Sequence, residues 1–135
     1  MTIRIATQND LLRIAKQDRH ISREELKNLI SLGRVAVAED GEVFMGWMRW
    51  NLFWDNTPFL NMLYLLEPHR GKGYGKAMMD WWEAEMQKQG FESLMTSTAS
   101  DEYAQHFYQR LEYSAVGGFA LPGESFELIF VKNLK

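Results

Sequence analysis

The sequence predicts an α+β (mixed α/β) fold, in which a central twisted mixed β-sheet of about seven strands is flanked by about four helices. Two observations predict it. Runs of alternating or continuous apolar residues, typical of strands, occur between segments whose apolar residues recur at helical spacing. A helical segment also separates two strand-like runs, 59–66 and 91–98, which predicts a parallel, right-handed crossover. The 135 residues suit a single domain over 1–135.

The expected elements follow one another in the order β-α-α-β-β-β-α-β-α-β-β, without a linker, a repeat or a low-complexity segment between them. The expected strands are residues 2–6, 34–39, 43–53, 59–66, 91–98, 113–119 and 125–131. The expected helices, with their caps, are residues 7–18, 22–33, 73–89 and 101–111.

The first two helices are predicted from their ends. Thr7, with Asp10 three positions later, has the pattern of a capping box, and so does Ser22 with Glu25. Gly33 is expected to end the second helix, because glycine accepts the left-handed conformation that follows many helix C-termini.

The middle of the chain predicts a hairpin followed by a buried strand. Asp40-Gly41 is a strong signal for a hairpin turn between the strands 34–39 and 43–53. Residues 56–58 (NTP) are expected to break the chain before the next strand. That strand, 59–66 (FLNMLYLL), is apolar almost throughout, as expected in the middle of a sheet.

The last part of the chain predicts two helices and three strands. Gly90 is expected to end the third helix, and apolar residues at helical spacing define the fourth helix at 101–111. A turn at Pro122-Gly123 is expected to join the last two strands.

Composition excludes several classes of function. Apolar residues make up 46% of the chain and charged residues 24%, and the net charge is −3, so a general affinity for nucleic acid is not expected. The chain has no cysteine, which excludes disulfides, thiolate metal sites and a cysteine nucleophile. His20 and His106 lack metal-ligand neighbours in the sequence, so no metal site is expected. Without a signal-peptide pattern or an apolar run of about 20 residues, a cytoplasmic protein is expected.

The segment 67–79 (EPHRGKGYGKAMM) combines glycines with basic residues between a strand and a helix. Glycines let the backbone adopt positive φ and approach a ligand closely. A helix N-terminus presents unpaired N–H groups and about half a positive charge. Together with Arg70, Lys72 and Lys76, these features predict an anion site suited to phosphate.

Two common phosphate-binding patterns do not fit this segment. The P-loop pattern requires Ser or Thr after Gly75-Lys76, where the chain has Ala77. The dinucleotide pattern requires a third glycine at the position of Lys76. The spacing that does occur is Arg-x-x-Gly-x-Gly, formed by Arg70, Gly73 and Gly75.

Residues 66–75 (LEPHRGKGYG) resemble the acetyl-CoA motif of the GCN5-related N-acetyltransferase (GNAT) superfamily. Residues 104–113 (AQHFYQRLEY) resemble a second segment of that superfamily, A-x-x-F-Y-x-x-L-G-F, and follow the first in the expected order. The resemblance covers the chain from about residue 2 to residue 132 and implies the GNAT fold, with acetyl-CoA as the cofactor. It also implies an enzyme, an N-acetyltransferase, that moves the acetyl group by direct attack of a primary amine of a small molecule or peptide.

The resemblance assigns roles to particular residues. Backbone N–H groups of the glycine loop would bind the pyrophosphate of the cofactor. The residues so implied are Arg70, Gly71, Lys72, Gly73, Tyr74, Gly75 and Lys76. The pantetheine arm would pair with the backbone at about Tyr64, Leu65 and Leu66, where the strands 59–66 and 91–98 are expected to separate. A backbone N–H of Leu65 or Leu66 would bind the developing oxyanion. Tyr108 would protonate the leaving thiolate.

The chain departs from the family pattern at two positions. Asp101 stands where the family often has an asparagine that contacts the pantetheine, and Asp can accept but not donate the same hydrogen bond. Glu112 stands where the A-x-x-F-Y-x-x-L-G-F segment has glycine, so the turn after that helix is expected to differ.

The sequence leaves the general base open. An amine nucleophile with a pKa of about 10.4 must lose a proton before it attacks. The strand 59–66 contains no acidic residue. Glu67, Asp55 and His69 are candidates, and so is a base made of ordered water and backbone carbonyls.

Two other functions remain open at this point. The first is a non-catalytic module that binds or senses acyl-CoA on the same fold, and the second is a protein that binds ATP or NAD through the glycine loop. Aromatic residues at 47–59 are read as core and as a possible face of a homodimer, or as a wall of the acceptor pocket. Nucleic acid and a membrane are not expected as partners.

Overall fold

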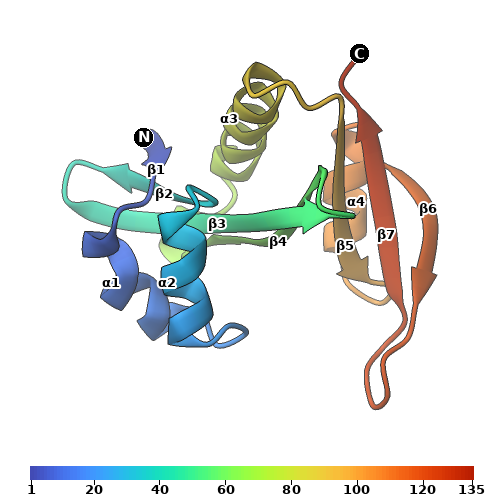
Figure 1. Cartoon of the computed structure of the whole chain (residues 1–135), viewed down its shortest axis with the longest axis horizontal. Helices are drawn as coiled ribbons and strands as arrows, with labels where there is room; N and C mark the ends of the chain where they lie inside the picture. The colour runs from blue at the N-terminus through green and yellow to red at the C-terminus, as the bar shows by residue number, and fades with distance from the viewer. The chain divides into compact units, whose positions relative to one another are not determined.

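The computed structural model describes all 135 residues and contains seven strands and four α-helices (Figure 1). The strands are β1 (Thr2–Ile5), β2 (Val35–Asp40), β3 (Val43–Phe53), β4 (Thr57–Leu65), β5 (Ser93–Ala99), β6 (Ser114–Phe119) and β7 (Glu127–Asn133). The α-helices are α1 (Leu11–Gln17), α2 (Arg23–Ser31), α3 (Tyr74–Lys88) and α4 (Ala104–Arg110). Short 3-10 helices occupy Gln8–Asp10 and Glu67–His69.

The strands form one mixed sheet in the order β1-β2-β3-β4-β5-β7-β6, and the predicted fold class and order of elements are confirmed. Some predicted bounds differ by one or two residues, such as those of β5 and β7, and two local details are wrong. The strand β4 begins at Thr57 and therefore includes Pro58, which was expected to precede it. The turn between β2 and β3 is centred on Gly41 and Glu42, one residue later than expected, because Asp40 still pairs with Val43. Gly41 has a φ of 60°, as the first position of a II′ hairpin turn requires.

Contacts divide the chain into two compact units, and each is described by itself. The single domain over 1–135 that the sequence predicts stays a prediction. None of the helices has the length and hydropathy that a membrane crossing needs.

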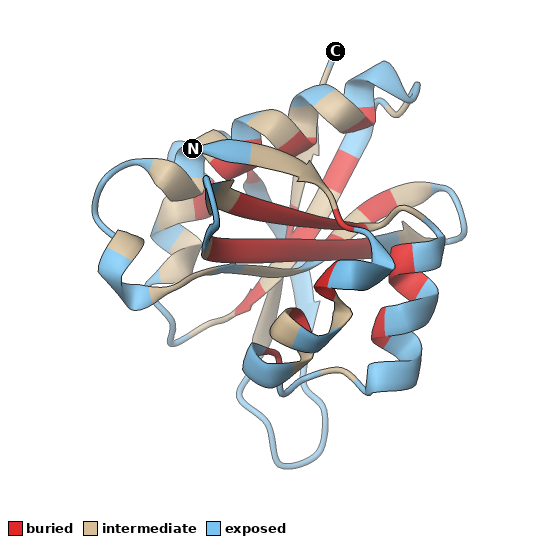
Figure 2. Cartoon of the chain, turned by 90° about the vertical axis from the view of Figure 1, so that its left-hand side faces the viewer, coloured by how far each residue is buried: buried red, intermediate tan, exposed pale blue.

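The first unit, residues 1–51 and 62–81, has its core between β2, β3 and the helices α1 and α2. Figure 2 shows β2 and β3 as buried strands. The apolar faces of the helices supply Ile14, Leu26, Leu29 and Ile30, which pack with Val35, Val37 and Trp47 of the strands. The helix starts follow the predicted caps: Asp10 accepts a hydrogen bond from the Thr7 N–H, and Ser22 accepts one from the Glu25 N–H.

A buried ion pair fixes the end of α1 to β3 in this unit. Asp18, directly after α1, has a fully buried side chain that accepts hydrogen bonds from Arg49 Nε at 2.7 Å and Trp47 Nε1 at 3.0 Å. The His20 N–H donates a further bond to the same carboxylate at 3.1 Å. Burial by itself raises the pKa of Asp18, but the hydrogen bonds from Arg49, His20 and Trp47, together with the charge of Arg49, hold the pKa below its ordinary value.

Replacing Asp18 with asparagine is expected to lower the free energy of unfolding by about 3–5 kcal/mol, because it leaves the Arg49 charge buried and unpaired. Urea unfolding at pH 7 measures the effect. Asp80→Asn is the matched control, since Asp80 pairs with Lys76 at the surface, where such a pair contributes at most about 1 kcal/mol.

The same comparison has a defined pH dependence. The folded-state pKa of Asp18 is lowered, so its stabilisation is present above the unfolded pKa, about 3.9, and is lost as pH falls through the folded value. The stability difference between the wild type and Asp18→Asn is therefore expected to shrink below about pH 4. A difference that stays constant down to pH 2 would contradict the assigned ion pair.

The second unit, residues 52–61 and 82–135, is built on β5 and β7, which pair antiparallel along their whole length. β6 pairs antiparallel with the other edge of β7, and β4 pairs in parallel with β5 at Phe59–Met95 and Leu60–Thr96. Residues 94, 96 and 98 of β5 are buried on one face, where Tyr108 of α4 packs against Phe130 of β7. Residues 95 and 97 lie on the opposite, half-buried face.

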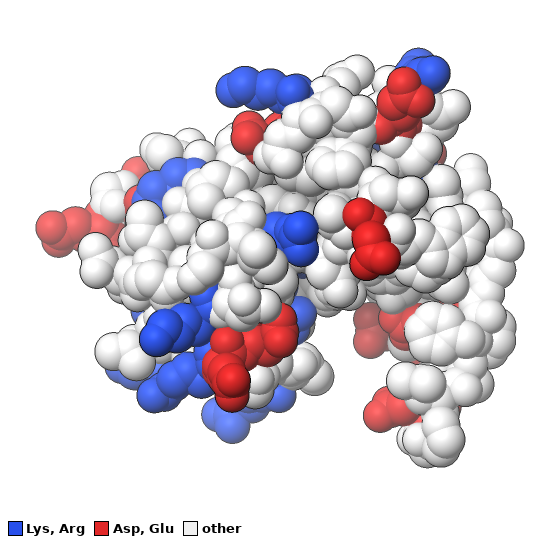
Figure 3. Space-filling view, in the orientation of Figure 1, with Lys and Arg blue, Asp and Glu red and all other residues white.

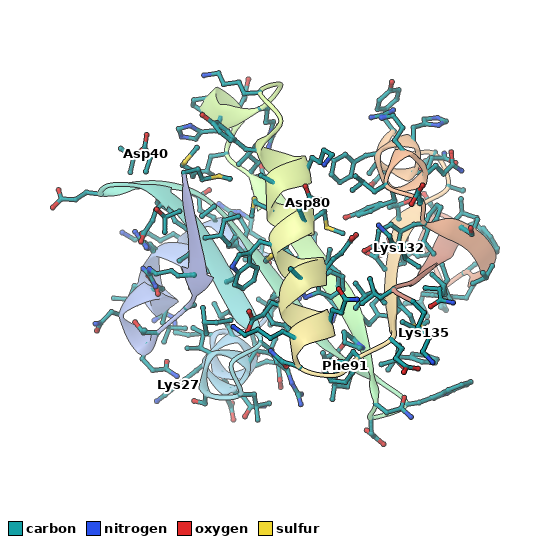
Figure 4. All side chains as sticks on the ribbon, turned by 90° about the horizontal axis from the view of Figure 1, so that it is seen from above. Lys27, Asp40, Asp80, Phe91, Lys132 and Lys135 are labelled. Carbon is teal, nitrogen blue, oxygen red and sulfur yellow. The ribbon has the colours of Figure 1, made fainter.

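Polar contacts in the second unit join α3 to β7. Glu83 of α3 accepts hydrogen bonds from Tyr113 Oη and from Lys132 Nζ of β7, each at 2.9 Å (Lys132 is labelled in Figure 4). Burial and the negative charge of Glu83 raise the pKa of Tyr113 well above its usual range. This phenol therefore stays protonated and serves as a structural hydrogen-bond donor.

Candidate functional site

The segment after β4 does not continue as a strand or a regular helix. It makes a single 3-10 turn at Glu67–His69, with Pro68 in its first positions, and then runs through the extended Arg70. Gly71 and Gly73 have φ values of 75° and 84°, which side chains other than glycine adopt only with strain. A Cβ added at either glycine would meet no atom within 4 Å, so the backbone of this loop is open to a ligand.

The loop ends at the N-terminus of α3. The first backbone bond of that helix runs from the Ala77 N–H to the Gly73 carbonyl at 3.1 Å. The N–H groups of Tyr74 and Gly75 precede it and therefore have no partner within the helix. Such groups, together with the helix dipole, bind anions.

The basic side chains of the loop lie differently from one another. Arg70 folds back on β4, where its Nε donates to the Leu65 carbonyl at 2.7 Å and its guanidinium lies 5.0 Å from the ring centre of Tyr64. Lys72 is exposed. Lys76 pairs with Asp80 one helical turn later at 2.8 Å, on the exposed side of α3 (Asp80 is labelled in Figure 4).

The end of β4 is held closely by β3. The Leu66 N–H donates to the Met45 carbonyl at 2.8 Å. Because N–H groups alternate along a strand, the Leu65 N–H points away from β3. The resemblance leaves two backbone N–H groups open as donors to the oxyanion. The Leu66 N–H is already bonded to Met45, whereas the Leu65 N–H is directed away from β3. Gly46 permits this approach, since a Cβ there would overlap the Tyr64 carbonyl.

The candidate proton donor Tyr108 lies on α4 in the second unit and is 7% exposed. Its ring packs edge-on against Tyr113, with ring centres 5.8 Å apart. Burial raises the pKa of Tyr108 to about 12, although a hydrogen bond with Thr96 of β5 acts in the opposite direction. Thr96 Oγ1 in turn donates to the Leu60 carbonyl of β4 at 3.0 Å. A buried phenol with this pKa is protonated at neutral pH, which is the state that a proton donor requires.

The two departures from the family motif have different structural outcomes. Asp101 is exposed before α4, and its carboxylate accepts a long hydrogen bond of 3.4 Å from Ser125 Oγ. Glu112 adopts a φ of 71° after the end of α4. The Tyr113 N–H bonds back to the Tyr108 carbonyl at 3.0 Å. The turn thus takes the left-handed form that glycine favours at this position, with a glutamate under backbone strain.

Replacing Glu112 with glycine is therefore expected to stabilise the protein. Relief of the left-handed strain contributes about 1 kcal/mol, which corresponds to a rise in Tm of about 3–5 °C for a chain of this size. The same change at Glu124, which is exposed and has no positive φ, is the control and is expected to lower Tm or leave it unchanged. A fall in Tm for Glu112→Gly would show that the side chain contributes more than the strain costs.

The candidate bases occupy exposed or turn positions. Glu67 is exposed in the 3-10 turn after β4, and the His69 N–H closes that turn on the Leu66 carbonyl. Asp55 lies at the tip of the β3–β4 hairpin with a φ of 64°.

One carboxylate is not among the residues that the sequence predicts, Glu127 at the start of β7. It is partly buried and accepts a hydrogen bond of 2.6 Å from Ser97 Oγ of β5. A single glutamate beside a predicted turn gives no sequence signal, because only the register of β5 and β7 brings Ser97 next to it. No group of three or more His, Asp or Glu side chains is arranged to hold a metal ion.

Comparisons with known proteins agree with this geometry. A family model described as "Acetyltransferase (GNAT) family" matches residues 6–113. No curated protein sequence matches the chain.

Solved structures share the fold at low sequence identity. A putative acetyltransferase, yncA from Salmonella typhimurium with its cofactor acetyl-CoA, has a TM-score of 0.82 at 19% identity, over 100% of this chain and 94% of the other. An aminoglycoside 6'-N-acetyltransferase complexed with coenzyme A has a TM-score of 0.80 at 17% identity, over 100% and 98%. The ribosomal-protein-S18-alanine N-acetyltransferase from Escherichia coli has a TM-score of 0.81 at 14% identity, over 98% and 93%.

The family match spans most of the chain and both of its motifs, the glycine loop before α3 and the α4 segment with Tyr108. Proteins of this family use acetyl-CoA as the acetyl donor. The chain belongs to the GNAT family of acetyltransferases.

Proposed function

We propose that the protein is an acetyl-CoA-dependent N-acetyltransferase that acetylates a primary amine of a small molecule or peptide by direct attack. One observation carries the proposal, the glycine loop at 70–75 with its positive φ values and its junction with the N-terminus of α3. This arrangement suits a diphosphate, which the cofactor contains. The aminoglycoside and protein acetyltransferases that share the fold support an amine acceptor.

In the proposed mechanism, backbone N–H groups of residues 70–76 bind the cofactor's pyrophosphate, and backbone at Tyr64–Leu66 pairs with its pantetheine arm. The cofactor supplies an acetyl group activated as a thioester. The Leu65 N–H stabilises negative charge on the thioester oxygen as the amine attacks. Tyr108 Oη would give its proton to the departing sulfur, so that the C–S bond breaks to a neutral thiol, and the attacking nitrogen would lose one proton to water or to one of the candidate bases.

Release of free CoA in the presence of a panel of amines tests the proposal. The panel contains amino acids, aminoglycosides, alkylamines, diamines and short peptides with free N-termini. We expect CoA release above the rate of hydrolysis with at least one acceptor, and mass spectrometry should find that acceptor heavier by one acetyl group.

Two other results would contradict the proposal. Binding of acetyl-CoA without CoA release for any amine would support a non-catalytic acyl-CoA module instead. Stronger thermal stabilisation by ATP or NAD than by acetyl-CoA would assign the glycine loop to another ligand.

A further inference from the structure

Glu127 differs from the other buried acidic side chains of the two units, because it has no basic partner. Asp18 pairs with Arg49 and Glu83 pairs with Lys132. Glu127 is partly buried as well, but only the hydroxyl of Ser97 donates to it, to Oε2 at 2.6 Å. A carboxylate that is partly removed from water without a counter-ion attracts a cation more strongly than a fully solvated one does.

The surroundings of Glu127 suit a cation with an apolar part. Phe119 of β6 is directly opposite Glu127 on β7, and residues so paired lie on the same face of the sheet with Cβ atoms about 5 Å apart. An aromatic ring beside a carboxylate adds cation–π attraction for an ammonium group. Residues 111–131 contain three glutamates and no lysine, arginine or histidine. No basic side chain of this segment therefore competes with a bound ammonium group for the Glu127 carboxylate.

An irregularity in β6 creates space at this point. The register shifts between Ala115 and Gly117, and this bulge brings Phe119 opposite Glu127 and Gly117 opposite Ile129. Ile129 of β7 pairs in turn with Ser97 of β5. A Cβ on Gly117 would meet no atom within 4 Å, so the face next to Ser97 and Glu127 is open where a side chain would otherwise stand.

The position along β5 relates this carboxylate to Tyr108. Successive residues of a strand point to opposite faces. Thr96 is on the face that carries Tyr108, and its neighbour Ser97 is on the face that carries Glu127. One point of β5 therefore has the candidate proton donor for the thiolate on one side and an uncompensated carboxylate on the other.

We propose that Glu127, positioned by Ser97 and flanked by Phe119, binds a protonated amine of the acceptor. The amine that attacks a thioester must be neutral, and Glu127 is on the opposite face of β5 from Tyr108. We therefore assign the ammonium group at Glu127 to a second amine of the acceptor. The acceptor is accordingly a diamine or polyamine, or another compound with an ammonium group besides the amine that is acetylated. The inference rests on the proposed acetyl transfer for its acceptor role, and its binding step can be measured without transfer.

Kinetics with paired acceptors test the inference. The acceptors are α,ω-diamines from 1,3-diaminopropane to 1,6-diaminohexane, each beside the monoamine of equal length. The wild type should prefer at least one diamine. Glu127→Gln should lower kcat/KM for that diamine about 10- to 100-fold, as loss of a hydrogen bond to a charged group implies, and leave the monoamine within about 2-fold.

Glu124→Gln is the matched control, because Glu124 lies three residues away on the exposed turn. It should keep the preference of the wild type for the diamine. Equal preference for monoamines and diamines in the wild type, an equal loss for both acceptors in Glu127→Gln, or the same loss in Glu124→Gln would each overturn the assignment.

A binding measurement separates failure of this inference from failure of the proposed function. Thermal stability is recorded with CoA present and with increasing diamine, so that no acetyl group can move. If the diamine stabilises the wild type but not Glu127→Gln, the assignment of Glu127 as an ammonium-binding residue is supported even if no acetyl transfer from acetyl-CoA is found. If acetyl transfer occurs and neither its preference for the diamine nor this stabilisation depends on Glu127, the proposed transferase function is supported and the ammonium site at Glu127 is refuted.

Discussion

Replacing Tyr108 with phenylalanine is expected to lower kcat about 10²- to 10⁴-fold, the usual contribution of a general acid, and to leave the affinity for acetyl-CoA nearly unchanged. The phenyl ring keeps the packing against Tyr113 and Phe130. Only the hydroxyl is lost, and in the proposed mechanism it acts when the C–S bond breaks. A group that acts mainly in the transition state changes kcat rather than binding.

Steady-state kinetics and calorimetric titration of acetyl-CoA measure the two effects separately. Tyr103→Phe is the control, because Tyr103 is 76% exposed at the start of the same helix. Burial raises the pKa of Tyr108 to about 12, which also predicts how kcat depends on pH. Below that pH the phenol is protonated, so its ionisation should cause no loss of kcat between pH 7 and 10. A kcat equal to that of the wild type would make Tyr108 a packing residue.

Replacing Gly73 with leucine is expected to abolish measurable binding of acetyl-CoA. Gly73 has a φ of 84°, and the space around its Cα is open. A side chain there would occupy that space and would force the loop out of the left-handed conformation, so that its N–H groups no longer converge on an anion. Thermal shift and calorimetry with CoA and with acetyl-CoA measure the loss.

Strain alone would also destabilise the variant, and Gly41→Leu controls for it. Gly41 has a comparable φ of 60° in the β2–β3 turn, and a Cβ there likewise meets no atom within 4 Å. Both variants should lose a similar amount of stability, while only Gly73→Leu loses the cofactor. Cofactor affinity that survives in Gly73→Leu would refute the phosphate-binding role of the loop.

The fold was largely predictable because its signals are local. The caps at Thr7 and Ser22, and the glycines that take positive φ, each act within a few residues, and the structure has them as predicted. The start of β4 was missed because Pro58 is tolerated at a strand end, where the sequence rule treats proline as a break.

The candidate site was predictable only where it is contiguous. The loop at 70–76 is one uninterrupted segment, and its character follows from glycine and charge. The engagement of the Leu66 N–H by Met45 and the pairing of Ser97 with Glu127 depend on strand register. The position of Phe119 opposite Glu127 depends in addition on the bulge in β6. Two adjacent glycines permit this bulge, but the sequence alone does not predict it.

Basic side chains are distributed unevenly over the surface, which the net charge alone does not show. In Figure 3, lysines and arginines lie among acidic side chains over α1 and α2, whereas the surface of the β6–β7 hairpin shows acidic and uncharged side chains only. The net charge of −3 is the sum over both surfaces and does not show this difference between them. An acceptor with several positive charges is therefore more compatible with the second surface than with the first.

The tip of the β3–β4 hairpin has a practical consequence for optical experiments. Trp54 is 80% exposed, whereas Trp47, Trp50 and Trp82 are at most 2% exposed. Iodide in solution will therefore quench the emission of Trp54 well before that of the buried indoles. The remaining emission, at shorter wavelengths, will come from the buried tryptophans and will monitor the environment of the core.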